Sequence, residues 1–110
     1  MENSIHILNK LLDGTALRHQ AISANIANVN TPGYRRKDVP FLDELKAAVE
    51  TNDPATIKAV TPQVRPDRSS APVRLEAEFA AMSQNQILYT TSADLISRKY
   101  ERLRRAIRGN

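Results

Sequence analysis

The sequence predicts an all-α protein in which two long amphipathic terminal helices form a coiled-coil-like pair, joined by a proline-rich, irregular middle. Apolar residues recur at alternating spacings of three and four over residues 5–29 and again over 75–107. This is the heptad pattern of helices that pack along one side. All six prolines lie between residues 32 and 72, so interruptions of helical structure are confined to the middle of the chain.

The chain is short enough to be one small domain at most, with 110 residues. We divide it into residues 1–33, an N-terminal heptad helix with its stop, residues 34–73, the irregular middle, and residues 74–110, a C-terminal heptad helix. We expect 1–33 and 74–110 to form one domain. Aromatic residues make up 5% of the chain and the mean hydropathy is −0.46, which indicates little core of its own.

The N-terminal helix carries its apolar positions in one unbroken series. The members of this series are Ile5, Leu8, Leu12, Thr15, His19, Ile22, Ile26 and Val29. Thr15 and His19 place a polar pair in the middle of the seam, which lowers stability but can fix the register. Asn3 or Ser4 can cap the start of the helix.

Several signals together predict where this helix ends. Thr31 precedes a proline and is therefore expected to be extended. Pro32 and Gly33 suit the two central positions of a type II turn, because glycine accepts a positive φ at the second. Asn28 tolerates the capping and left-handed conformations found at helix ends. The residues that we expect to set the exit from the helix are Asn25, Asn28, Thr31, Pro32 and Gly33.

The middle contains weaker signals. Residues 41–50 could form a short helix with Phe41, Leu42, Leu45 and Val49 on one side. The pair Asp53-Pro54 suits a turn or a helix start, residues 57–64 could be extended, and residues 64–72 resemble a flexible link. We expect this middle to be partly ordered at best in an isolated chain.

The heptad pattern returns in the C-terminal helix without a glycine or proline to interrupt it. Its series is Leu75, Phe79, Met82, Gln86, Tyr89, Ala93, Ile96, Tyr100, Leu103 and Ile107. Leu88 and Leu95 form a second, narrower stripe, and Gly109 is placed to end the helix. Glu76 and Glu78 lie in the first turns, where the helix dipole favours acidic residues.

The net charge of +4 comes from the end of this helix. Residues 98–108 contain six basic residues and one acidic residue, a balance of +5. This stretch is either a solvated helix face or a contact for acidic surfaces of other proteins. A nucleic-acid interface is disfavoured, because a basic region of the bZIP kind precedes its heptads and here the charge overlaps their C-terminal end. Tyr100 belongs to the seam and is not free to stack on bases.

Catalytic, metal and cofactor sites are not expected. The chain has no cysteine, and His6 and His19 lie too far apart to be one-turn metal ligands. Only three glycines are present, and no phosphate-binding loop is formed by them. No apolar run approaches the ~18 residues of a membrane span, and no cleavable signal peptide is visible. We therefore predict a protein that is not an enzyme, uses no cofactor and is not inserted in a membrane.

Two helices have no interior and cannot bury both seams and the additional leucines. The remaining apolar surface requires other chains, and contacts that do not close on themselves build filaments. The residues predicted to make packing contacts between subunits are Ile5, Leu8, Leu12, Ile22, Ile26, Val29, Phe79, Met82, Tyr89, Ile96, Tyr100, Leu103 and Ile107.

Residues 24–39, with the helix before them, resemble the N-terminal signature of the flagellar basal-body rod protein family. The matching positions are Asn25, Asn28, Thr31, Pro32, Gly33 and Tyr34. The short chain and residues 34–41 are most similar to the proximal rod subunit of the B type.

This resemblance implies a structural subunit of the proximal rod, which assembles through its terminal helices into a helical tube that transmits torque. The implied partners are copies of itself, other rod subunits, and the rod-adaptor protein and membrane ring of the basal body. The implied location is periplasmic, reached by type III export without a cleaved signal peptide. The alternative that the heptads leave open is a small coiled-coil adaptor or chaperone that binds acidic protein partners.

Overall fold

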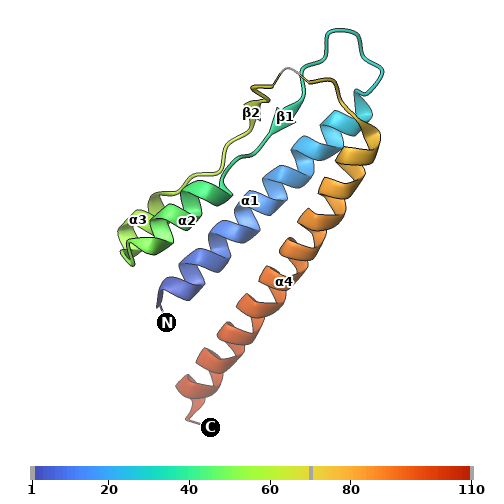
Figure 1. Cartoon of the computed structure of the whole chain (residues 1–110). Coiled ribbons are helices and arrows are strands. Elements are labelled where there is room, and N and C mark those ends of the chain that lie inside the picture. Colours follow the sequence, from blue (N-terminus) through green and yellow to red (C-terminus); the bar gives the residue numbers. More distant parts are fainter. Residues whose placement is uncertain (1, 70, 110) are drawn as a thin grey trace.

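The computed structural model describes residues 2–69 and 71–109 (Figure 1). Two long helices run antiparallel and side by side, and the middle of the chain packs on the other side of the first helix. The molecule is elongated, with extents of 60 × 26 × 14 Å. The predicted fold, a mostly helical chain with paired terminal helices and an irregular middle, is confirmed. The elements in chain order are α1 (Glu2–Ala27), β1 (Lys37–Asp38), α2 (Leu42–Glu50), α3 (Pro54–Ala59), β2 (Arg65–Pro66) and α4 (Leu75–Arg108).

Helix α1 is about 39 Å long, from 26 residues at 1.5 Å each. The expected cap at Asn3 or Ser4 is wrong, because the helix already includes Glu2. The side chain of Asn3 instead donates a hydrogen bond to Oδ1 of Asn52, at 2.9 Å, in the link between α2 and α3.

The turn after α1 has the features that its sequence predicts. The backbone N–H of Tyr34 donates to the carbonyl of Thr31 at 3.2 Å, and Gly33 has a φ of 76°, as a type II turn requires. Asn28 donates through Nδ2 to the carbonyl of Ala24 and accepts from the hydroxyl of Thr31. The carbonyl of Ala24 also accepts from the backbone N–H of Asn28 at 3.1 Å, so the asparagine side chain adds a second hydrogen bond at the end of the helix.

The hydrophobic core lies between α1 and the middle of the chain. Its buried members are Ala21, Val39, Phe41, Leu45, Ala48, Ile57 and Val60. The expectation of a middle that is partly ordered at best differs from this structure. Three of the largest apolar residues in the middle, Val39, Phe41 and Ile57, are at most 1% exposed, and their burial against α1 stabilises the segment.

The ring of Phe41 rests directly on the backbone of α1 at Gly14. A Cβ atom at position 14 would overlap the distal ring atoms, so only glycine permits this approach. The guanidinium of Arg18 lies 5.0 Å from the ring centroid and donates to the carbonyl of Val39 at 3.0 Å. Burial lowers the pKa of Arg18, and the nearby carboxylate of Asp38 opposes this effect.

Helix α3 includes residues 57–59 of the segment expected to be extended over 57–64, whereas Val60 has an extended backbone. Asp53 caps this helix by accepting from the backbone N–H of Ala55 at 3.3 Å, and Pro54 occupies its first position. Ile57 is therefore helical, and the extended prediction for it is wrong because the Asp-Pro start propagates one short helix. Strands β1 and β2 then pair antiparallel over two residues each.

Helix α4 has 34 residues and is about 51 Å long. It contacts α1 and no other helix or strand of the described chain. Gly109 ends it in a left-handed conformation with a φ of 74°, as the sequence predicts.

Candidate functional site

Asn25 joins three parts of the chain through one buried amide. Its Nδ2 donates to the carbonyl of Lys37 at 2.9 Å and to Oε2 of Glu78 at 3.3 Å. Its Oδ1 accepts from the backbone N–H of Lys37 at 2.9 Å and from the hydroxyl of Tyr34 at 3.0 Å. The amide pairs with the Lys37 backbone as a neighbouring strand would, and it fixes β1 and α4 relative to α1. Burial, with the charge of Glu78, raises the pKa of Tyr34.

Glu78 is 1% exposed, and a basic side chain compensates for its charge. Arg36 donates through Nε to Oε1 of Glu78 at 2.5 Å and through a terminal nitrogen to Oδ2 of Asp67 at 3.1 Å. Burial by itself lowers the pKa of Arg36, but the bonds to these two carboxylates outweigh it and the pKa is raised. The backbone and hydroxyl of Ser69 donate to Asp67 and, with Arg36, lower its pKa. We call Asn25, Arg36, Asp67 and Glu78 the polar lock.

Sequence reasoning did not find most of the polar lock. The sequence identifies Asn25 as part of the helix exit and Glu78 only as a favourable charge in the first turns of α4. Arg36 carries no periodic or motif signal that would pair it with Glu78 or Asp67, which lie 42 and 31 residues away along the chain.

The seam between α1 and α4 is largely small and polar. Asn85 donates through Nδ2 to the backbone carbonyl of Thr15 at 2.8 Å, and its Oδ1 is buried without a hydrogen-bond partner among the described residues. The buried polar residues at this seam are Thr15, Asn25, Glu78, Asn85 and Ser92, and the buried apolar ones are Leu8, Ile22 and Ile96.

The apolar series predicted in α4 lies one residue away from the buried seam. Positions 78, 85 and 92 face α1, whereas the predicted series passes through 79, 86 and 93. A one-residue offset turns a side chain by about 100° around the helix, which exposes Phe79 and Gln86. The members from Tyr100 onward are exposed because α4 continues there past the start of α1. Its exposed apolar members are Leu75, Phe79, Tyr89, Tyr100, Leu103 and Ile107, which we call the outer stripe. Ile96 is buried, Met82 and Ala93 are half-buried, and Gln86 is exposed.

The apolar series predicted in α1 is divided between the seam and the surface. Leu8 and Ile22 are buried. Among the other predicted packing residues, Ile5, Leu12, Ile26 and Val29 are half-buried. A groove of about 320 Å³ separates the two helices on this flank and is lined by Ala16, His19 and Gln20 of α1 and Gln86 and Tyr89 of α4, with Thr15 and Asn85 at the seam. Because Leu12 and Ile26 lie one heptad on either side of His19, the apolar flank of α1 adjoins the outer stripe.

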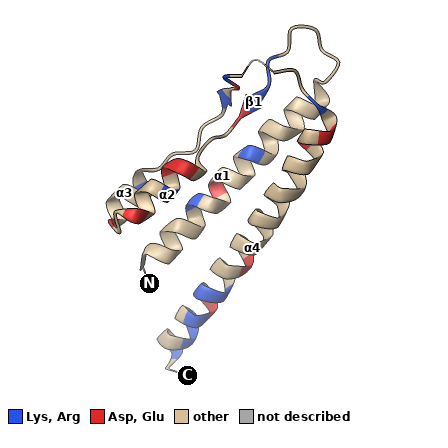
Figure 2. Ribbon diagram, viewed as in Figure 1, with Lys and Arg blue, Asp and Glu red and all other residues tan. Residues whose placement is uncertain are grey.

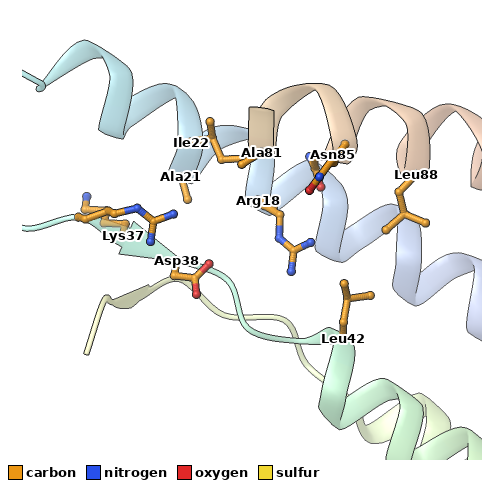
Figure 3. Close-up of a pocket in the computed structure, with 11 residues that line it drawn as sticks. Arg18, Ala21, Ile22, Lys37, Asp38, Leu42, Ala81, Asn85 and Leu88 are labelled. Atoms are coloured by element: carbon orange, nitrogen blue, oxygen red, sulfur yellow. The ribbon is translucent and has the colours of Figure 1, made fainter. Parts of the chain in front are cut away.

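A second cavity of about 300 Å³ lies between α1, α4 and the segment from β1 to α2 (Figure 3). Figure 3 shows Arg18, Asp38 and Leu42 around the same space as Ala81 and Leu88 of α4. The lining is mixed in character, and no nucleophile is paired with a base in it.

A cluster of basic residues lies at the C-terminal end of α4, as Figure 2 shows. Arg98 pairs with Asp94 at 3.0 Å, and Glu101 lies 3.7 Å from Arg104 and 3.9 Å from Arg105. These pairs are exposed and contribute little to stability. The remaining positive charge faces solvent.

No group of three or more histidine or acidic side chains in residues 2–69 and 71–109 lies close enough to hold a metal ion. No helix within the same residues has the length and apolar character needed to cross a bilayer.

Comparison with known proteins places these features in a family. A family model described as "Flagella basal body rod protein" matches residues 15–35, which contain the end of α1 and the turn after it. The flagellar basal body rod protein FlgB of Borreliella burgdorferi is 30% identical over 112 residues, covering 80% of this chain and 83% of that protein. FlgB of Cereibacter sphaeroides is 29% identical over 107 residues, covering 84% of each. FlgB of Escherichia coli strain K12 is 34% identical over 56 residues, covering 51% of this chain and 41% of that protein.

The first two of these similarities each cover at least 80% of this chain and more than 80% of the relative. The chain belongs to the flagellar basal body rod protein family, among its FlgB members, and is a structural protein rather than an enzyme.

Proposed function

We propose that this chain, a proximal-rod subunit of the flagellar basal body, assembles through its terminal helices into a helical tube that transmits torque. The observation that carries the proposal is the outer stripe. Apolar side chains line one side of α4 over most of its length, and no element of the described chain other than α1 contacts that helix.

The division of residues between seam and surface supports this proposal. In a self-contained helical hairpin the apolar residues are buried between the helices and the polar ones face water. Here the polar Thr15, Asn85 and Ser92 are buried, while Phe79 is 54% exposed and Leu103 is 47% exposed. An exposed apolar row of this length marks a surface that other chains cover.

The neighbours that we propose are copies of this chain and other rod subunits, with the rod-adaptor protein and the membrane ring beneath them. Rod subunits that each have terminal helices of this kind can pack them against one another. The outer stripe of one subunit would then be buried by the helices of the next. The location that follows is the periplasmic part of the basal body, reached by type III export without a cleaved signal peptide.

Torque transmission follows from how such contacts share a load. Each apolar contact is weak, but a stripe of many side chains along about 51 Å of helix distributes shear over its whole length. The polar lock supports this role within one subunit, because the charged pair of Arg36 and Glu78 holds α4 to the segment after α1.

The experiment replaces exposed stripe residues in a flagellated host that lacks its own copy. Phe79→Asp and Tyr89→Asp are expected to abolish swimming in soft agar and rod completion, because each places a charge in a buried subunit contact. Ile87→Asp is the matched control, since Ile87 is 68% exposed on the same helix but lies outside the stripe. This control is expected to swim.

Circular dichroism of the three purified variants should show unchanged helix content, because all three positions are exposed. Normal swimming by Phe79→Asp and Tyr89→Asp would overturn the proposal. If Ile87→Asp also abolished swimming, the effect would not be specific to the outer stripe, and the proposal that subunits assemble through it would fall.

A further inference from the structure

The C-terminal end of α4 extends beyond the start of α1. Asn85 lies opposite Thr15 and Glu78 opposite Asn25, so at this register residues 100–108 pass the first residue of α1 (Figure 1). All of these residues are exposed. We call residues 100–108 the overhang.

The overhang is amphipathic, although no helix or strand within residues 2–69 and 71–109 other than α1 contacts α4 and residues 100–108 are all exposed. Tyr100, Leu103 and Ile107 follow one another at spacings of three and four and therefore share one side of the helix. Ile107 is 85% exposed, the most exposed of the large apolar side chains. Arg104 lies next to this row, and further arginines cover the remaining sides (Figure 2). The overhang thus offers an apolar ridge with a positive border.

A surface of complementary character lies between α2 and α3. A groove of about 340 Å³ is lined by small and apolar residues, with one carboxylate among them. Its lining residues are Glu44, Ala47, Ala48, Thr51, Thr56, Ala59 and Val60. Exposed acidic residues border the two helices, and Figure 2 shows them on α2 and at the α2–α3 end. These residues are Asp43, Glu44, Glu50 and Asp53.

We propose that the groove between α2 and α3 of one copy receives the overhang of a second copy of this chain. The proposal rests on the proposed function and names one contact within the assembly. Apolar side chains of the overhang would fill the alanine-lined groove, and Arg104 would lie near Glu44. The overhang of its own chain does not fill the groove, because among the described helices and strands α4 contacts only α1.

This contact gives the assembly a direction. The groove and the overhang are different surfaces, so each copy carries one of each and the contact is heterologous. Repeating such a contact adds copies in one direction without closing a dimer, which is the kind of contact that a tube requires.

Disulfide trapping tests the contact directly, because the chain has no cysteine of its own. A disulfide requires Cα atoms within roughly 7 Å, so it reports the contact closely. A mixture of an Ala59→Cys chain with an Ile107→Cys chain is expected to form a disulfide-linked heterodimer under mild oxidation. A chain with both cysteines is expected to form a ladder of higher oligomers. The matched control pairs Ile107→Cys with Ala80→Cys, an exposed position in the N-terminal part of α4 that is expected to give only background.

Charge exchange adds a second readout on the same disulfide. Glu44→Lys in the groove chain or Arg104→Glu in the overhang chain is expected to lower the yield of heterodimer about ten-fold, and the two together should restore most of it. Arg68→Glu changes the net charge equally in an exposed loop and is expected to leave the yield unchanged. A mixed pair that gives no more disulfide than the Ala80 control, or a yield that the double exchange does not restore, would overturn the contact.

The two proposals fail in different experiments. If trapping fails while Phe79→Asp still abolishes swimming, the rod function stands and the contact between overhang and groove falls. If the ladder forms while the stripe variants swim normally, the contact stands and the proposed use of the stripe falls.

Discussion

Gly14→Ala is expected to destabilise the chain, although helix propensity alone predicts the opposite. Gly14 lies inside α1, where alanine is favoured over glycine by about 1 kcal/mol. In the structure, a Cβ at this position would overlap the Cε and Cζ atoms of the Phe41 ring. Phe41 is 1% exposed and surrounded by the core, so its ring has no free space to move into.

The size of the effect follows from these two opposing contributions. Overpacking a filled core typically costs about 1–3 kcal/mol, and an overlap with several ring atoms belongs at the upper end of that range. Subtracting the propensity gain leaves a net loss of about 2 kcal/mol. A loss of this size corresponds to a fall in the melting temperature of roughly 10 °C for a chain of this length.

A double-mutant cycle with Phe41→Leu separates the two contributions. Leucine keeps the γ and δ carbons but lacks the ε and ζ atoms that the new Cβ would meet. In this background Gly14→Ala is expected to stabilise the chain by about 1 kcal/mol, because only the propensity gain remains. The difference in stability between Ser83→Ala and Ser83→Gly, at an exposed position in α4, measures that gain without a core contact.

Urea denaturation followed by circular dichroism at 222 nm is the appropriate assay, since most of the described chain is helical. The reasoning is refuted if Gly14→Ala raises the urea midpoint of the otherwise unchanged chain. It is equally refuted if the alanine costs the same free energy with leucine as with phenylalanine at position 41.

Three further variants test polar groups of the polar lock and of the seam by the same urea assay. Asn25→Asp is expected to lower the free energy of unfolding by about 3 kcal/mol, because a second carboxylate would face Glu78 and the amide that donates to Glu78 would be gone. An unchanged urea midpoint would contradict this. The lowered pKa of Asp67 contributes stability above its unfolded-state pKa, and this is lost as the pH falls through the lower folded-state value. Asp67→Asn should therefore reduce the loss of stability between pH 6 and about 3, and an unchanged acid profile would count against the contribution. Asn85→Leu is expected to raise the free energy of unfolding by about 1 kcal/mol, because it removes a buried oxygen without a hydrogen-bond partner. A lower free energy of unfolding would contradict this.

The sequence determined the terminal helices and the turn between α1 and β1 because their signals are local. Heptad spacing specifies a helix over any stretch where it persists, and Pro32-Gly33 specifies the turn through φ alone. Neither signal depends on what lies across the molecule.

The same spacing could not identify the side of α4 that faces α1. In α4, the row of side chains through position 78 and the row through position 79 repeat with the same period. Apolar periodicity predicts that the more apolar row, through 79, forms the seam. The buried row contains Glu78, and only its contacts with Asn25 and Arg36, 53 and 42 residues away in the sequence, make that burial favourable. The core around Phe41 was missed for the same reason, since its partners on α1 are remote in sequence.

Asn85 illustrates why such a seam is consistent with a subunit of a larger assembly. Its amide forms one hydrogen bond, to a carbonyl of Thr15 in a helix, and leaves Oδ1 buried without a partner. An apolar side chain would avoid the desolvation cost of that oxygen and gain burial against α1. A polar residue at a helix seam lowers stability but restricts register, because any sliding of α4 along α1 would break the hydrogen bond from Asn85 to Thr15. If the seam were wholly apolar, α4 would have two apolar faces, the seam and the outer stripe, and either could pack on α1. The polar row distinguishes them, so the apolar side stays outward and available to the next subunit.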